Sequence, residues 1–148
     1  MEEVVALSAG AWGPVFASVE QVLGRAVFLR VWPDWPVSHA EYVRGARRGD
    51  EARVWVADVD GRAVGFVAVI IDRESSRGEI EIISVDPRHQ RKGIAGVLIA
   101  QAIEYIRRSG CGVAIVETGG DPGHAPARAT YESAGFTALP MARYHKNL

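Results

Sequence analysis

Two periods of hydrophobic residues along the chain predict most of its elements. Over residues 11–22, apolar side chains recur every three or four positions, which predicts an amphipathic helix. Apolar and polar residues alternate over 53–58, a largely apolar stretch covers 62–71, and 79–85 ends in apolar, β-branched residues, which predicts three strands. The same criteria predict helices over 38–48, 93–109 and 125–134, and shorter strands over 4–7, 113–118, 136–139 and 142–146.

Turn-forming residues separate these elements. Asp60-Gly61 predicts a type I′ hairpin, because both residues tolerate positive φ. The two prolines of residues 32–36 predict a loop, and Pro14 suits the first turn of the helix over 11–22. Ser38 and Glu41 form a capping-box pattern for the second helix, and Gly110 is a C-cap candidate for the third. The order β-α-α-β-β-β-α-β-α-β-β predicts one mixed α/β domain over residues 1–148.

Composition narrows the class of protein. The 148 residues are 48% hydrophobic and 24% charged, with a net charge of −1, which is ordinary for a globular domain. We therefore expect no nucleic-acid or membrane partner. The single cysteine, Cys111, excludes an internal disulfide and is compatible with a reducing compartment. The start Met1-Glu2-Glu3 lacks a basic, apolar leader, so we expect a cytoplasmic protein.

The segment 79–96, EIEIISVDPRHQRKGIAG, holds the candidate chemistry. A strand ends at Asp86-Pro87, a basic loop follows, and two glycines open the next helix. The first N–H groups of a helix lack intrahelical acceptors, and the helix dipole is positive at that end. The segment therefore predicts a site for a phosphate-bearing ligand.

The loop matches neither a P-loop nor a dinucleotide fingerprint, but Gln90-Arg91-Lys92-Gly93-Ile94-Ala95 fits [RQ]-x-x-G-x-[GA]. With the strand before it and Tyr131-Glu132-Ser133-Ala134-Gly135-Phe136 after it, the chain resembles the GCN5-related N-acetyltransferase (GNAT) superfamily from about Val54 onward. The resemblance implies an α/β fold whose mixed, mostly antiparallel central sheet splays at its middle strands and is flanked by helices. It also implies transfer of an acetyl group from acetyl-CoA, as cosubstrate, to a primary amine of a small molecule or peptide.

The resemblance assigns cofactor contacts to two segments and one histidine. The pyrophosphate loop would consist of Arg88, Gln90, Arg91, Lys92, Gly93, Ile94, Ala95 and Gly96. The backbone of Ile83, Ser84 and Val85 would hold the pantetheine arm. His124 stands where the family commonly has asparagine, and it could contact the cofactor, act as a base or cap the following helix. Arg128 could reach a phosphate or lie on the surface.

The roles of the candidate catalytic and acceptor-binding residues are less closely defined by the sequence. Glu79 and Glu81 lie two apart on a strand and therefore on one face, as a general base or as an exposed charged pair. Tyr131 would protonate the leaving thiolate, or pack in the core. Trp32, Asp34 and Trp35 could frame a cationic amine, or the tryptophans could simply pack a stiff loop. No metal-ligand spacing is present among the histidines and Cys111.

Three functions remain open from the sequence. They are an N-acetyltransferase, an acyl-CoA-binding module of the same fold without efficient catalysis, and a nucleic-acid-binding domain, because KH domains also use a GxxG loop. A KH loop joins two helices, whereas the sequence predicts a strand before Gly93, and the near-neutral charge also opposes nucleic acid. The C-terminal strands of the family often help to form dimers, which leaves a homodimer open.

Overall fold

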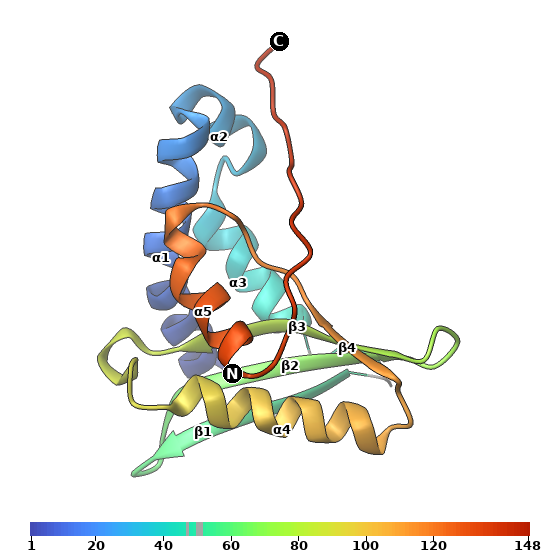
Figure 1. Cartoon of the computed structure of the whole chain (residues 1–148). Helices are drawn as coiled ribbons and strands as arrows, with labels where there is room; N and C mark the ends of the chain where they lie inside the picture. Colours follow the sequence, from blue (N-terminus) through green and yellow to red (C-terminus); the bar gives the residue numbers. More distant parts are fainter. Residues whose placement is uncertain (47, 50–51) are drawn as a thin grey trace.

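Helices cover both faces of a four-stranded sheet (Figure 1). The computed structural model describes residues 1–46, 48–49 and 52–148. The elements, in order, are α1 (Glu2–Leu23), α2 (Arg25–Val31), α3 (Trp35–Gly45), β1 (Ala52–Val59), β2 (Arg62–Asp72), β3 (Arg77–Val85), a 3-10 turn η1 (Pro87–His89), α4 (Ile94–Arg108), β4 (Val113–Val116), a second turn η2 (Pro122–His124) and α5 (Ala125–Ser133). The predicted α/β architecture with a mixed sheet is confirmed.

The strands lie in sequence order, β1-β2-β3-β4. The first three pair antiparallel, and β4 pairs parallel to β3. The β1–β2 hairpin turns at Asp60 and Gly61, whose φ values of 53° and 78° confirm the type I′ turn. A β-bulge interrupts the β2–β3 register at Glu81, since Ala68 pairs with Ile82 but Val69 pairs with Ile80.

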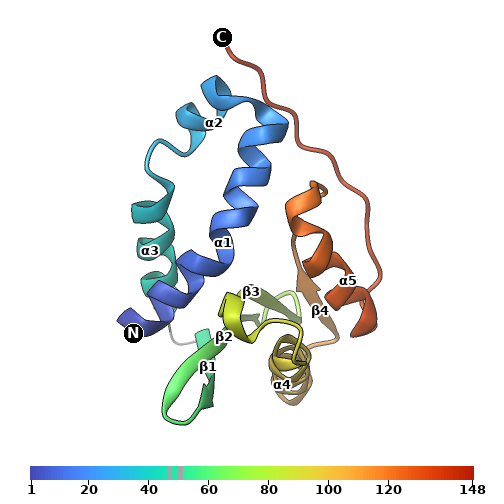
Figure 2. The ribbon, with the colours of Figure 1, turned by 90° about the vertical axis from the view of Figure 1, so that its left-hand side faces the viewer.

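β3 and β4 share only a short stretch of pairing, from Arg77↔Val113 to Ile80↔Val116. β4 ends there, so among the described residues 81–85 of β3 no strand lies on that side. Figure 2 shows α1 and α5 on the two sides of this region. We call it the β3–β4 divergence, and it is the opening of the sheet that the sequence led us to expect.

Each face of the sheet has its own hydrophobic core. On one face, α1 and α3 pack through Val4, Val5, Leu7, Val43 and Ala46 against Phe66, Ala68 and Ile82. On the other face, α4 packs through Leu98, Ile99, Ala102 and Ile106 against Val67, Val69, Ile71, Ile80 and Val85. β2 is covered on both faces, so its apolar residues run almost without interruption from Val64 to Ile71. Helix packing on both sides thus fixes where β3 and the start of α4 lie.

The N-terminal part differs from the prediction. The strand expected over 4–7 is instead the first turn of α1, because Val4 and Ser8 lie one helical turn apart and both are buried. Pro14 therefore lies inside a helix, and not in its first turn. Helix α2 was not predicted, and Trp35 and Pro36, expected in a loop, begin α3.

The capping box at Ser38 is also wrong. The N-cap of α3 is Asp34, and the Ser38 hydroxyl donates back into the helix to the Asp34 carbonyl, at 3.1 Å. Part of the predicted helix end, at residue 47, lies outside the described residues. By contrast, Gly110 has a φ of +81° directly after the Ser109 C-cap of α4, as its assignment to that helix end requires.

The two strands predicted over 136–139 and 142–146 are not formed, and residues 136–148 have no regular structure. This segment leads away from α5 towards α2 without joining the sheet (Figures 1 and 2). Leu139 and Met141 are each 81% exposed, so the apolar pattern there meets no partner strand. Among the described residues, no helix combines the length and hydropathy needed to cross a membrane.

Candidate active site

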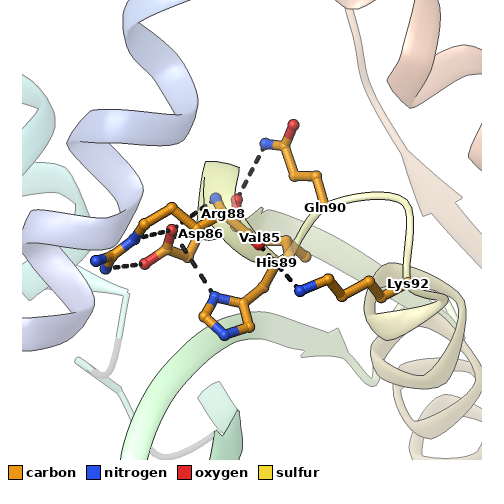
Figure 3. Close-up of polar contacts among 6 residues, drawn as sticks. All are labelled: Val85, Asp86, Arg88, His89, Gln90 and Lys92. Atoms are coloured by element: carbon orange, nitrogen blue, oxygen red, sulfur yellow. Dashed lines mark hydrogen bonds and ion pairs between the residues drawn. The ribbon is translucent and has the colours of Figure 1, made fainter.

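The basic loop joins β3 to α4 (Figure 3). Gly93 is the N-cap of α4 at a φ of +83°, a left-handed conformation that favours glycine, and Arg91 has a φ of +60°. No side chain caps this helix end. The N–H groups of Ile94, Ala95 and Gly96 therefore begin the helix without intrahelical acceptors. The loop consequently has the backbone geometry of an anion site.

Side chains of the loop hold its shape. The Gln90 amide donates to the Val85 carbonyl at 3.1 Å, and the Lys92 ammonium donates to the Arg88 carbonyl at 3.1 Å (Figure 3). Arg88 turns to Asp86, with Nη2 to Oδ2 at 2.7 Å. Hydrogen bonds from the side chain and backbone of Arg88 hold the pKa of Asp86 well below its usual range. Arg88 and the Lys92 ammonium are thus already paired within the loop, whereas no described residue pairs with the side chain of the exposed Arg91.

At the β3–β4 divergence, the N–H and C=O groups of successive β3 residues point alternately towards β2 and towards the open edge. The Asp86 N–H donates to the Val64 carbonyl of β2 at 2.9 Å. Because alternate residues of an antiparallel pair share one neighbour, Ser84 also faces β2, whereas Ile83 and Val85 turn their N–H and C=O groups the other way. The Gln90 contact with the Val85 carbonyl fits this direction. Ile83 and Val85 could therefore bind an extended ligand through the backbone.

The Ser84 side chain belongs to a buried hydrogen-bond network on the face of the sheet that α1 and α3 cover. Its hydroxyl accepts from Trp12 Nε1 at 3.0 Å and lies 2.9 Å from the Ser8 hydroxyl. Ser8 in turn lies 2.9 Å from His39 Nε2. Burial lowers the pKa of His39, which keeps the imidazole at the end of this hydrogen-bond network neutral. The network fixes α1 and α3 against β3.

The carboxylates Glu79 and Glu81 meet Tyr42 of α3. The Tyr42 hydroxyl donates to the Glu81 carbonyl at 3.1 Å. Burial, and then the charge of Glu79, raise the pKa of Glu81, although a hydrogen bond from Tyr42 opposes the shift. Burial and the two carboxylates raise the pKa of Tyr42 to about 12. Glu81 is half-buried and Glu79 exposed, and the raised pKa of Glu81 makes it the candidate general base.

Tyr131 lies in the core on the α4 side, in one cluster with Val85 and Ile99. Burial raises the pKa of Tyr131 to about 12. No described residue hydrogen-bonds its hydroxyl, and the ring lies edge-on to Phe136 at 6.1 Å. The phenol is therefore next to the β3 segment but is a weak acid.

The residues predicted for the acceptor pack against α1. Trp35 stacks on Phe16 with ring centroids 4.5 Å apart, and Trp32 lies edge-on to Phe16 at 6.2 Å. Asp34 is exposed and occupies the N-cap position of α3, where its side chain makes no capping hydrogen bond. Trp32 also approaches His145 of the C-terminal segment at 6.3 Å. The rings thus form an aromatic cluster on the helical side of the site.

Sequence reasoning missed the partners of His124. The imidazole Nδ1 hydrogen-bonds Asp121 Oδ1, and Asp121 also accepts from Ser18 of α1 at 2.6 Å. Arg128, considered as a phosphate ligand, instead donates to the carbonyls of Gly119 and Asp121 at 2.6 and 2.9 Å. The Asp-Pro-Gly sequence is typical of a 3-10 turn and could have indicated Asp121. Within the described ranges, no cluster of His, Cys, Asp or Glu could hold a metal ion.

Comparison with known proteins gives consistent matches. Residues 20–136 match the profile of the acetyltransferase (GNAT) family. Streptothricin acetyltransferase of Streptomyces lavendulae is 36% identical over 110 residues, covering 73% of this chain and 56% of the relative. The crystal structure of nourseothricin acetyltransferase aligns at a TM-score of 0.56 and 34% identity, over 60% of this chain and 51% of that one. AAC(6')-Iy in complex with a bisubstrate analogue shares the fold over 92% of this chain and 90% of its own, with a TM-score of 0.60 and 20% identity.

Proposed function

Because the chain belongs to the acetyltransferase (GNAT) family, we propose that it transfers an acetyl group from acetyl-CoA to a primary amine. The observation that supports this most is the loop 88–96, which places helix-start amides beside a strand whose outer edge has no neighbour among the described residues. An amide cluster suits a pyrophosphate, and an open strand edge suits the amide-bearing pantetheine arm. The chain spans 56% of streptothricin acetyltransferase and 51% of nourseothricin acetyltransferase, so activity of the whole protein is part of the proposal.

The cofactor would lie along the β3–β4 divergence. The amides of Ile94, Ala95 and Gly96, with Arg91, would bind the pyrophosphate, and Lys92 would join them by exchanging the Arg88 carbonyl for a phosphate oxygen. The backbone of Ile83 and Val85 would hold the pantetheine arm, and an N–H of this strand would stabilise the oxyanion that forms on the thioester carbonyl. Since Arg88 is already paired with Asp86, we assign it to the shape of the loop and not to direct phosphate binding.

The carboxylates of Glu79 and Glu81 would bind and deprotonate the acceptor amine. Glu81, with its raised pKa, would take the first proton from the acceptor ammonium, and Glu79 would attract the cation. The aromatic cluster of Trp32 and Trp35 would bind the acceptor body, with Asp34 at its rim. The names of streptothricin acetyltransferase and nourseothricin acetyltransferase favour a small amine-bearing molecule as acceptor. Tyr131 would supply a proton to the thiolate only at a cost, because its pKa is about 12.

Ligand-dependent thermal unfolding tests the cofactor. Acetyl-CoA at 100 times its dissociation constant should add about 2.7 kcal/mol to the free energy of unfolding. For a chain of this size, that raises Tm by roughly 5–11 °C. No shift at millimolar acetyl-CoA would contradict both acetyl transfer and simple acyl-CoA binding.

Turnover separates an enzyme from a binding module. A panel of primary amines with acetyl-CoA should release free thiol, followed with a thiol reagent. Glu81→Gln should lower kcat more than Glu79→Gln does. Tyr131→Phe should lower kcat less than Glu81→Gln does if Tyr131 is mainly a core residue. Binding of acetyl-CoA without thiol release for any amine would instead support the non-catalytic module. The nucleic-acid alternative is disfavoured, because the loop joins a strand to a helix.

A further inference from the structure

We infer that His124, held by Asp121, is a proton-transfer residue of the acetyl transfer reaction, an inference that rests on the proposed function. The pair lies in the loop between β4 and α5, outside the β3–α4 segment that the sequence singled out. It takes the proton that the acceptor nitrogen must lose after attack and delivers it to the departing sulfur. Asp121 acts as the positioning residue.

Asp121 is anchored by three donors. One carboxylate oxygen accepts from the Ser18 hydroxyl at 2.6 Å and from the Gly123 N–H at 3.1 Å. The other accepts from His124 Nδ1. The side chains of His124 and Asp121 are only 13% and 11% exposed. Burial alone would raise the pKa of Asp121, but the hydrogen bonds from Ser18 and His124 outweigh it and lower that pKa, so the group stays a carboxylate.

The loop is shaped around this pair. A Cβ on Gly119 would lie 2.5 Å from Asp121 Oδ1 and 2.5 Å from His124 Nδ1. A Cβ on Gly123 would lie 2.5 Å from Ser18 Cβ. Arg128 then binds the carbonyls of Gly119 and Asp121 from α5. Two glycines and a clamping arginine thus allow the carboxylate–imidazole contact, which an ordinary surface turn would not need.

Trp12 links the pair to the cofactor strand. The Trp12 indole donates to Ser84 of β3 at 3.0 Å, and its ring lies edge-on to His124 with centroids 6.1 Å apart. One tryptophan therefore contacts both β3 at the divergence and the imidazole. No described residue hydrogen-bonds His124 Nε2, although Nδ1 is occupied. A carboxylate on Nδ1 fixes the tautomer and leaves the Nε2 lone pair available to a proton.

Among the described residues, the charged groups of the imidazole's own surroundings are Asp121, which binds it, and Arg128, which binds the loop. Asp121 and Arg128 come from its own loop and from α5, while α1 presents the uncharged Ser18 and Trp12. His39 lies beyond the Trp12 ring, with centroids 5.3 Å from it. If the residue at position 124 only had to hydrogen-bond a pantetheine amide, a neutral side-chain amide would be sufficient. A buried carboxylate behind the imidazole adds what a proton carrier needs, a counter-charge for the imidazolium.

Atoms and charges balance in this transfer. The neutral amine attacks the thioester carbonyl, and the C–N bond forms to give a tetrahedral intermediate with a protonated nitrogen. His124 Nε2 takes that proton, and Asp121 stabilises the imidazolium. The C–S bond then breaks, the sulfur leaves with the electron pair, and Nε2–H returns the proton to it. The products are the amide, free coenzyme A thiol and the original imidazole.

The test compares wild type with His124→Asn, His124→Gln and Asp121→Asn, using acetyl-CoA and the best amine of the panel over pH 5.5–9. We expect kcat to fall roughly 100-fold or more in both His124 variants, with acetyl-CoA affinity within threefold of wild type across this pH range. Asp121→Asn should lower kcat roughly tenfold and also keep acetyl-CoA affinity within threefold, a split that loss of fold would not produce. Asp58→Asn, which alters a carboxylate in the β1–β2 hairpin, is the matched control and should leave kcat unchanged.

The outcomes separate the two proposals. A His124 variant that keeps kcat within threefold, or that loses only acetyl-CoA affinity, would show that His124 contacts the cofactor and transfers no proton. If one substitution unfolds the protein, as seen in its Tm, the other His124 variant decides. Wild type that acetylates no amine would overturn the proposed function itself, and this inference with it.

Discussion

Substitution of Gly96 by alanine should make the protein more stable and a worse binder of acetyl-CoA. Gly96 is the third residue of α4, is exposed, and has no atom within 4 Å of the position of a Cβ. Its backbone is helical, so glycine costs stability there by about 0.5–1 kcal/mol relative to alanine. Nothing in the protein itself therefore requires a glycine at this position. We attribute it to a ligand that approaches the backbone.

The magnitudes follow from this geometry. The gain in helix propensity should raise Tm by roughly 1–4 °C for a chain of this size. In the complex, a methyl group at the helix start would displace the pyrophosphate and weaken one hydrogen bond to a charged group, which costs about 1.5–3 kcal/mol. The dissociation constant of acetyl-CoA should then rise by roughly 10- to 150-fold.

Thermal unfolding of the free protein and titration calorimetry with acetyl-CoA measure the two effects separately. Gly45→Ala is the matched control, because Gly45 also lies in a helix, α3, is not followed by proline, and has no described atom within 4 Å of its Cβ position. It should stabilise the fold and leave acetyl-CoA affinity unchanged. If Gly96→Ala is stabilised and still binds acetyl-CoA within twofold of wild type, the pyrophosphate does not approach this helix start as we propose.

Two further predictions concern the packing that supports the site. A Cβ on Gly78 of β3 would lie 2.4 Å from Ile106 Cγ1 of α4, so Gly78→Ala should cost about 1–3 kcal/mol in urea unfolding. Combined with Ile106→Ala it should cost less than the sum of the two, and strict additivity would refute the contact. Burial lowers the pKa of His39 in the folded protein, so as the pH falls the unfolded chain takes up a proton on His39 before the folded protein does. The free energy of unfolding should therefore fall as the pH drops below about 6.5, the usual pKa of histidine. His39→Gln should lose this part of the acid sensitivity, and an unchanged slope between pH 7 and pH 5 would contradict the assignment.

The sequence by itself determined the elements whose partners are close along the chain. The β1–β2 hairpin, β3, the loop at Gly93 and the C-cap at Gly110 were all predicted, because turn chemistry and periodicity are local properties. The candidate cofactor loop is one continuous segment with a recognisable pattern. Its residues alone were therefore enough to propose both the loop and the family.

Only the tertiary structure decided the features that depend on distant residues. Val4 and Val5 favour a strand by composition, but burial against Phe66 and Ile82 makes them helical. The segment 136–146 was predicted to form strands, yet no described strand pairs with it and it stays irregular. Ser18 and Asp121, 103 positions apart, meet only because α1 crosses the loop after β4. A side chain's proton affinity and its partners are set by such crossings, which no local pattern encodes.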